Sequence, residues 1–185
     1  LVYRTDRFAK SMEFTGPIEL HLFASIDADD ANFVVKVWQI TQGGTRMPLS
    51  RAGYLKASHQ LDKKNSKLGI PAHDHSKRVP VKAGEIREYV IEVNPIGMVF
   101  DPGTCLELEI KAMDPFEHQD GTWTGKVGNM GPLPSANTIN YKIYRDKEYQ
   151  SYLLMPHIPS TPGENWLQGY DQGGGFGASG AGATH

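Results

Sequence analysis

His73 and His75 come closest, among the residues of this chain, to the types and spacing of a metal site. In a β-strand, residues i and i+2 lie on the same face, so the two imidazoles could bind one ion. A site needs a third ligand, and His59 and His118 are candidates only by residue type. Hydrogen-bonding histidines that face solvent or another domain fit the same pattern. We therefore predict no metal site and no cofactor, and place His59, His73 and His75 at a domain interface or a pocket rim.

The sequence contains no motif that is typical of nucleophilic catalysis. The serine of an α/β-hydrolase lies in Gly-x-Ser-x-Gly, because its tight turn tolerates only small neighbours. The nearest match, Gly177-Ala178-Ser179-Gly180, fails at its last position. Cys105 comes where a strand should begin, with no helix N-terminus to activate its thiol, and is predicted to be buried and inert. We predict no catalytic residue in this chain.

Paired carboxylates are the remaining candidates for acid–base chemistry. Glu107 and Glu109 lie two residues apart and so on one side of a predicted strand. That spacing favours a solvated sheet face over a catalytic pair, and a solvated face is the prediction.

The composition excludes several classes of protein. The chain has 185 residues, of which 39% are hydrophobic, which suits one globular domain. Nineteen Lys and Arg face 21 Asp and Glu, for a net charge of -2, so no basic excess favours nucleic acid or an anionic membrane. No apolar run is long enough to span a bilayer. The single cysteine cannot form an intrachain disulfide.

Hydrophobic residues alternate with polar ones almost everywhere, which is the period of a β-strand. The runs cover residues 18–24, 33–40, 89–93, 106–110, 139–143 and 152–154. Turn signals lie between them, at Gly16-Pro17, Asp29-Asp30, Gly43-Gly44, residues 82–84, Asn94-Pro95 and residues 101–103. Short strands separated by turns predict an all-β protein with an antiparallel sandwich or barrel. The predicted core residues are Val35, Val37, Ile91, Leu106, Leu108 and Ile110.

Two regions depart from the strand pattern. Residues 114–137 form a long polar loop that carries Trp123 and is expected to be functional or mobile. Residues 161–185 are rich in glycine and are expected to form a flexible tail. The predicted domain therefore spans residues 1–160.

Six segments, in order, resemble the C-terminal domain of the Xaa-Pro dipeptidyl-peptidase and cocaine esterase-like (CocE/NonD) serine hydrolases. They are residues 14–25 (FTGPIELHLFAS), 31–38 (ANFVVKVW), 50–59 (SRAGYLKASH), 80–86 (PVKAGEI), 100–110 (FDPGTCLELEI) and 142–156 (KIYRDKEYQSYLLMP). The resemblance implies a jelly-roll β-sandwich of the galactose-binding-like type. It also implies a preceding α/β-hydrolase domain that carries a Ser-Asp-His triad. Because the resemblance starts late in that domain, its first strands are expected to be absent from this chain.

The resemblance implies an accessory role in ester or amide cleavage, including release of Xaa-Pro dipeptides. The chain would pack on its hydrolase domain and shape the substrate entrance, with Trp123 beside the three histidines at the rim. The exposed interdomain face predicts self-association as a homo-oligomer, and the expected location is cytoplasmic. The alternative is a stand-alone module that binds carbohydrate or another ligand through Trp123, His118 and Asp120 on the long loop.

Overall fold

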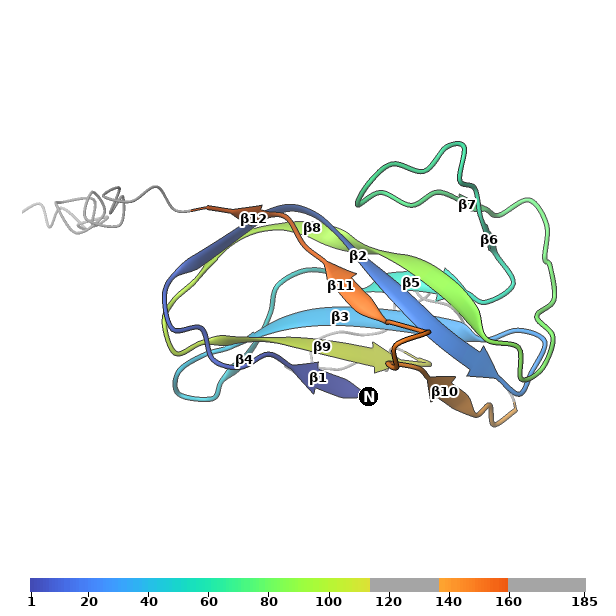
Figure 1. The fold of residues 1–185 in the computed structure, drawn as a ribbon, viewed down its shortest axis with the longest axis horizontal. Helices are drawn as coiled ribbons and strands as arrows, with labels where there is room; N and C mark the ends of the chain where they lie inside the picture. The colour runs from blue at the N-terminus through green and yellow to red at the C-terminus, as the bar shows by residue number, and fades with distance from the viewer. Residues whose placement is uncertain (114–136, 160–185) are drawn as a thin grey trace, which may run out of the picture.

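The computed structural model describes residues 1–113 and 137–159, and every regular element in these parts is a β-strand. The strands form two antiparallel sheets packed face to face, with a short hairpin of β6 and β7 beyond one end (Figure 1). This confirms the predicted all-β class and antiparallel sandwich. No helix in the described parts is long and apolar enough to span a membrane. The galactose-binding-like subtype and the absence of first strands stay predictions.

The first sheet, here the β3 sheet, is centred on β3 (Asn32–Ile40). One edge of β3 pairs with β9 (Cys105–Lys111), which pairs in turn with β1 (Val2–Arg4). The other edge pairs with β5 (Gly53–Lys56) and β4 (Arg46–Pro48).

The second sheet, here the β2 sheet, is assembled around β2 (Met12–Ile26). One edge of β2 pairs with the long strand β8 (Arg87–Phe100). The other edge pairs in succession with β10 (Tyr141–Ile143), β11 (Tyr152–Leu154) and β12 (His157–Ile158). A single strand thus aligns four others.

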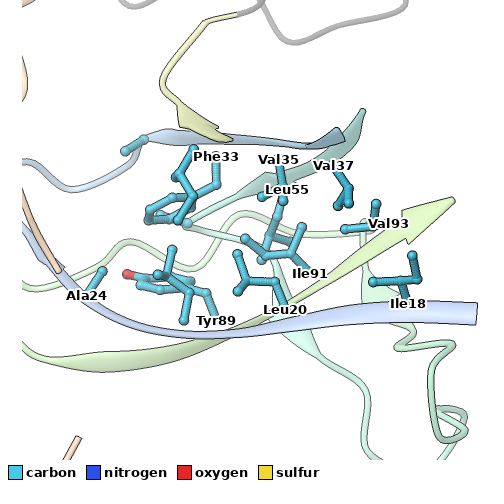
Figure 2. Close-up of a cluster of buried hydrophobic side chains, with 14 of the residues drawn as sticks. Ile18, Leu20, Ala24, Phe33, Val35, Val37, Leu55, Tyr89, Ile91 and Val93 are labelled. Carbon is cyan, nitrogen blue, oxygen red and sulfur yellow. The ribbon is translucent and has the colours of Figure 1, made fainter. Parts of the chain in front are cut away.

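The core lies between the two sheets, where alternate side chains of each sheet meet (Figure 2). The fully buried members include Ile18, Leu20, Phe33, Val35, Val37, Ile91 and Val93. Five of the six predicted core residues are buried as expected. Leu108 is the correction: it is only partly buried against the core, because it lies opposite Tyr3 of the three-residue edge strand β1.

Two predicted turns are wrong, because Gly16-Pro17 lies inside β2 and Asn94-Pro95 lies inside β8. The two signals face each other across the sheet. The register shifts there, since Gly16 pairs with Ile96 and Ile18 pairs with Val93. Prolines cannot donate ladder hydrogen bonds, so they collect at a β-bulge and both strands continue beyond it.

The prediction of a solvated face at Glu107 and Glu109 is also wrong. Glu107 is 1% exposed and accepts hydrogen bonds from Arg4 Nε at 2.5 Å and Arg46 Nε at 2.6 Å. Arg46 Nη2 lies 2.8 Å from Glu109, which also accepts from Trp38 Nε1 at 3.0 Å. The carboxylates tolerate burial because neighbouring strands supply these donors. The network joins β1, β9, β3 and β4 on the outer side of the β3 sheet.

A second charged network lies on the outer side of the β2 sheet. His21 contacts Glu88 through Nδ1 at 2.7 Å and Glu19 through Nε2 at 2.9 Å, and its ring stacks on Tyr152. Burial alone would lower the pKa of His21, but the hydrogen bonds to Glu88 and Glu19 raise it above its ordinary value. Glu19 uses its other oxygen to accept a hydrogen bond from Gly69 N at 3.0 Å. The network therefore attaches the connection that carries Gly69 to the sheet.

We predict that Ile91→Ala lowers the free energy of unfolding by about 2–5 kcal/mol, because it leaves a cavity between the sheets. Leu108→Ala is the matched control and should cost less, since Leu108 is already partly exposed. Urea denaturation midpoints of both variants measure the difference. An equal cost for the two substitutions would contradict the described core.

We also predict that the stabilising effect of His21 depends on pH. Because folding raises its pKa, the protonated ring stabilises the fold fully below the ordinary pKa of about 6.5. That contribution is lost as the pH rises through the folded-state pKa. His21→Asn should therefore destabilise the fold more at about pH 5.5 than at about pH 9, as urea denaturation would show.

His59→Asn provides the opposite case, because burial lowers the pKa of His59 on folding. Its removal should be tolerated better at about pH 5.5 than at about pH 9. A loss from His21→Asn that is independent of pH would refute the role assigned to the charged ring.

Candidate functional site: the histidine cluster

The candidate site lies on the connection between β5 and β8, residues 57–86. This connection contains β6 (Gln60–Leu61) and β7 (His73–Asp74), which pair through Gln60↔Asp74 and Leu61↔His73. One further step in the same antiparallel register places His59 opposite His75. His73 lies two residues from His75 and shares its face. The hairpin thus brings three histidines together.

The contact between His59 and His75 is close and direct. Their Nδ1 atoms are 2.9 Å apart, and their ring planes are perpendicular with centroids separated by 4.6 Å. The His73 ring lies farther away, with its centroid 6.4 Å from that of His75. His73 also hydrogen-bonds the backbone of Val90 in β8.

The cluster disfavours protonation. Burial lowers the pKa of His59, and the neighbouring His75 lowers it further. Burial also lowers the pKa of His73, and the other two rings add to that effect. A neutral His59–His75 pair forms one hydrogen bond, in which one Nδ1–H donates and the other Nδ1 accepts. Such a pair places one nitrogen lone pair between the rings.

Asp30 fixes the start of the connection and hence the position of His59. Its carboxylate accepts hydrogen bonds from Ser58 N at 3.0 Å, Ser58 Oγ at 2.9 Å and Ala31 N at 2.9 Å. Burial would raise the pKa of Asp30, but the Ser58 hydrogen bonds lower it below its ordinary value. Arg78 closes the other end, with Nη2 2.7 Å from Asp29 and Nε 3.4 Å from Asp30.

The tip of the connection, defined here as residues 66–70, is held against β2. Gly69 has a φ of +76°, and a Cβ at this position would lie 2.6 Å from Cγ of Pro17. Gly69 N also donates to the buried Glu19 carboxylate. The close approach and the left-handed backbone both require glycine. They hold two apolar side chains in solvent, Leu68 at 81% exposure and Ile70 at 49%.

The chemistry of the cluster is hydrogen bonding and lone-pair donation. Across the described residues, no group of three or more His, Cys, Asp or Glu side chains is arranged to hold a metal ion. In the same residues, His21 hydrogen-bonds carboxylates and His59 hydrogen-bonds His75. Ser58 and Ser76 donate to Asp30 and Asp74. These contacts are structural, and they do not form a Ser-His-Asp relay.

The structure brings His59, His73 and His75 together, whereas Trp123 lies outside the described residues. The same holds for His118 and Asp120. Sequence analysis missed the exposed tip and its attachment through Glu19 and Gly69. Glu19 and His21 do alternate with apolar residues, which was a signal for one outer face. Their partners Gly69 and Glu88 lie too far along the chain for that pattern to reveal them.

The fold is similar to that of several solved hydrolases. A CocE/NonD family hydrolase from Staphylococcus aureus superposes with a TM-score of 0.70 at 23% identity, over 85% of this chain and 30% of that protein. An aminopeptidase from the marine sediment archaeon Thaumarchaeota archaeon gives a TM-score of 0.59 at 17% identity, over 86% of this chain and 26% of that one.

The sequence is similar to part of a longer esterase as well. It is 25% identical over 158 residues to cocaine esterase from Rhodococcus sp. (strain MB1 Bresler), covering 85% of this chain and 25% of that enzyme. The chain thus spans between a quarter and three tenths of the length of these relatives. Residues 1–154 match the model of the X-Pro dipeptidyl-peptidase C-terminal non-catalytic domain. The chain belongs to this family of non-catalytic C-terminal domains, which occur in CocE/NonD-type hydrolases.

Proposed function

We propose that this chain is the accessory domain of a serine hydrolase that cleaves esters or amides, including Xaa-Pro dipeptide bonds. It packs on an α/β-hydrolase domain of the same protein and shapes the entrance to the substrate pocket. The observation that carries the proposal is the family match over residues 1–154. Its extent supports the reading, because the similar proteins are three to four times longer than the matched region.

The tip of the connection is the surface that we assign to the hydrolase domain. Leu68 and Ile70 are exposed apolar side chains on a segment anchored by Gly69. Exposing apolar area in water is unfavourable, and a rigid tip has already lost the entropy that docking would otherwise cost. A partner that buries both side chains gains their transfer free energy. An apolar recess in the hydrolase domain fits this surface.

The charges around the tip add to its selectivity. Lys63, Lys64 and Lys67 are exposed on the same short segment. The carboxylate of Asp62, at the start of this segment, accepts hydrogen bonds from neighbouring residues, from Lys64 N at 3.0 Å and from Asn65 Nδ2 at 2.6 Å. The segment that carries Leu68 therefore also carries three exposed positive charges. We expect acidic side chains around the receiving recess, because complementary charges favour association.

We predict that the isolated chain turns over neither p-nitrophenyl acetate nor Ala-Pro-p-nitroanilide. The reason is that its sequence contains no Gly-x-Ser-x-Gly motif to present a nucleophile. The measurement is release of p-nitrophenol or p-nitroaniline against a heat-denatured control. Turnover that survives mutation of the tail serine Ser179 would overturn the accessory role.

We predict that Leu68→Asp weakens binding to the separately expressed hydrolase domain by about tenfold or more, because it buries a charge where an apolar group docked. Met47→Asp is the matched control. Met47 is also an exposed apolar residue, at 46%, but it lies on β4 of the other sheet. Sedimentation equilibrium of the chain alone and with the hydrolase domain measures both complex formation and self-association.

Equal affinities for the wild type and Leu68→Asp would move the contact away from the tip. A chain that stays monomeric and ignores the hydrolase domain would refute the accessory role altogether, and would support an independent binding module.

A further inference from the structure

The geometry of the His59–His75 pair fits two ligands of one metal ion as well as a hydrogen bond. Two imidazole nitrogens that bind one metal ion lie about 2.0–2.1 Å from it, so at a right angle they are about 2.8–3.0 Å apart. The observed Nδ1–Nδ1 distance is 2.9 Å. Rings that point at such an ion have centres about 4.5–4.6 Å apart, and the observed separation is 4.6 Å. Both distances agree with a right-angled pair of ligands.

The hairpin backbone holds the two ligands in this arrangement. Gln60↔Asp74 and Leu61↔His73 are paired, and His59 and His75 follow in the same register. Ser58, next to His59, is fixed by two hydrogen bonds to Asp30. Preformed ligands lose little entropy when they bind an ion, and this strengthens chelation by two groups. His75 is exposed, so water has access to the remaining coordination positions.

We propose that His59 and His75 chelate one divalent late-transition-metal ion through their Nδ1 atoms, with water completing the coordination. Right-angled nitrogen and oxygen ligands suit Ni²⁺ and Cu²⁺, which form octahedral or tetragonal complexes. His73 is not a ligand, because its ring lies too far from His75 and hydrogen-bonds the backbone of Val90. This proposal does not depend on the hydrolase partner.

The proton balance permits a metal ion to replace the hydrogen bond between the two rings. In the neutral pair, one ring carries its proton on Nδ1, and this N–H donates a hydrogen bond to Nδ1 of the other ring. Binding requires both rings in the tautomer with the proton on Nε2. The donor ring therefore moves its proton from Nδ1 to Nε2 through water. No net proton is released, and no bond to carbon changes.

The bound ion would cross-link the two ends of the β6–β7 hairpin. Residues 60–74, including the tip, would then lie within a closed loop. Because the ion binds the folded chain more tightly than the unfolded one, it should raise the thermal midpoint of unfolding. The site thus links metal binding to the stability of the tip.

The test is calorimetric titration of the untagged chain with Ni²⁺ at neutral pH in a non-chelating buffer. We expect one ion per chain at this pair and a rise in thermal midpoint at saturating Ni²⁺. His75→Asn should weaken binding by about tenfold or more, because one ligand cannot chelate. His59→Asn should weaken binding to the same extent. Because His75 is exposed, His75→Asn is not expected to disturb the fold, so a loss of binding in that variant reports on the ligand itself. Mg²⁺ should give no signal, since it prefers oxygen ligands.

His157→Asn is the matched control, because His157 is an exposed histidine on β12 whose ring contacts Phe14, at a tilted angle, and not another histidine. It should bind Ni²⁺ as the wild type does. Undiminished binding in both His59→Asn and His75→Asn would overturn the proposal. So would equal losses in these variants and in His157→Asn, or the absence of Ni²⁺ binding to the wild type.

Discussion

The Glu19 carboxylate links the β2 sheet to the exposed tip at residues 66–70. It lies on β2, the strand that aligns four others, and is 5% exposed. One of its oxygens contacts His21 and the other accepts from Gly69 N. Without this acceptor, the amide of Gly69 would be buried without a partner, at a cost of about 1–3 kcal/mol. The position of the tip therefore depends on one side chain of β2, 50 residues earlier in the chain.

The same interaction explains how a segment with little regular structure can be well positioned. Within the long connection, β6 and β7 pair over two residues each, and one isolated bridge joins Lys67 and Ile70. The rest is fixed by backbone hydrogen bonds, such as Asp62 N to Ala72 O and Val79 N to Ser58 O. Side chains add to them: Asp30 at the start, Glu19 at the tip and Arg78 farther along. Charged groups satisfy backbone and side-chain donors here in the way that a longer ladder would. The histidine pair and the apolar tip are both supported from outside the connection.

Much of the fold could be predicted from the sequence, because alternation is a local property. The runs at 18–24, 33–40 and 106–110 lie within observed strands, and Cys105 is buried at the start of β9 as predicted. The errors arise where distant residues meet. Asn94-Pro95 has the composition of a turn, but in the structure it lies opposite Gly16-Pro17, where the register of β2 and β8 shifts. Glu107 resembles a solvated residue until Arg4 and Arg46 flank it. Likewise, the spacing of His73 and His75 could not indicate that His59 is the nearer partner of His75.

Cys105 gives this molecule a built-in reporter of its own motions. It is the single thiol in the chain, and it is 6% exposed at the start of β9. The N-terminal segment is hydrogen-bonded beside it, from Phe8 N to Thr104 O and from Thr5 N to Leu106 O. Because Cys105 is buried, a thiol reagent labels it only when the surrounding structure opens, so the rate of labelling measures the local free energy of opening at the start of β9. This opening can therefore be followed in the unmodified protein, without an introduced probe.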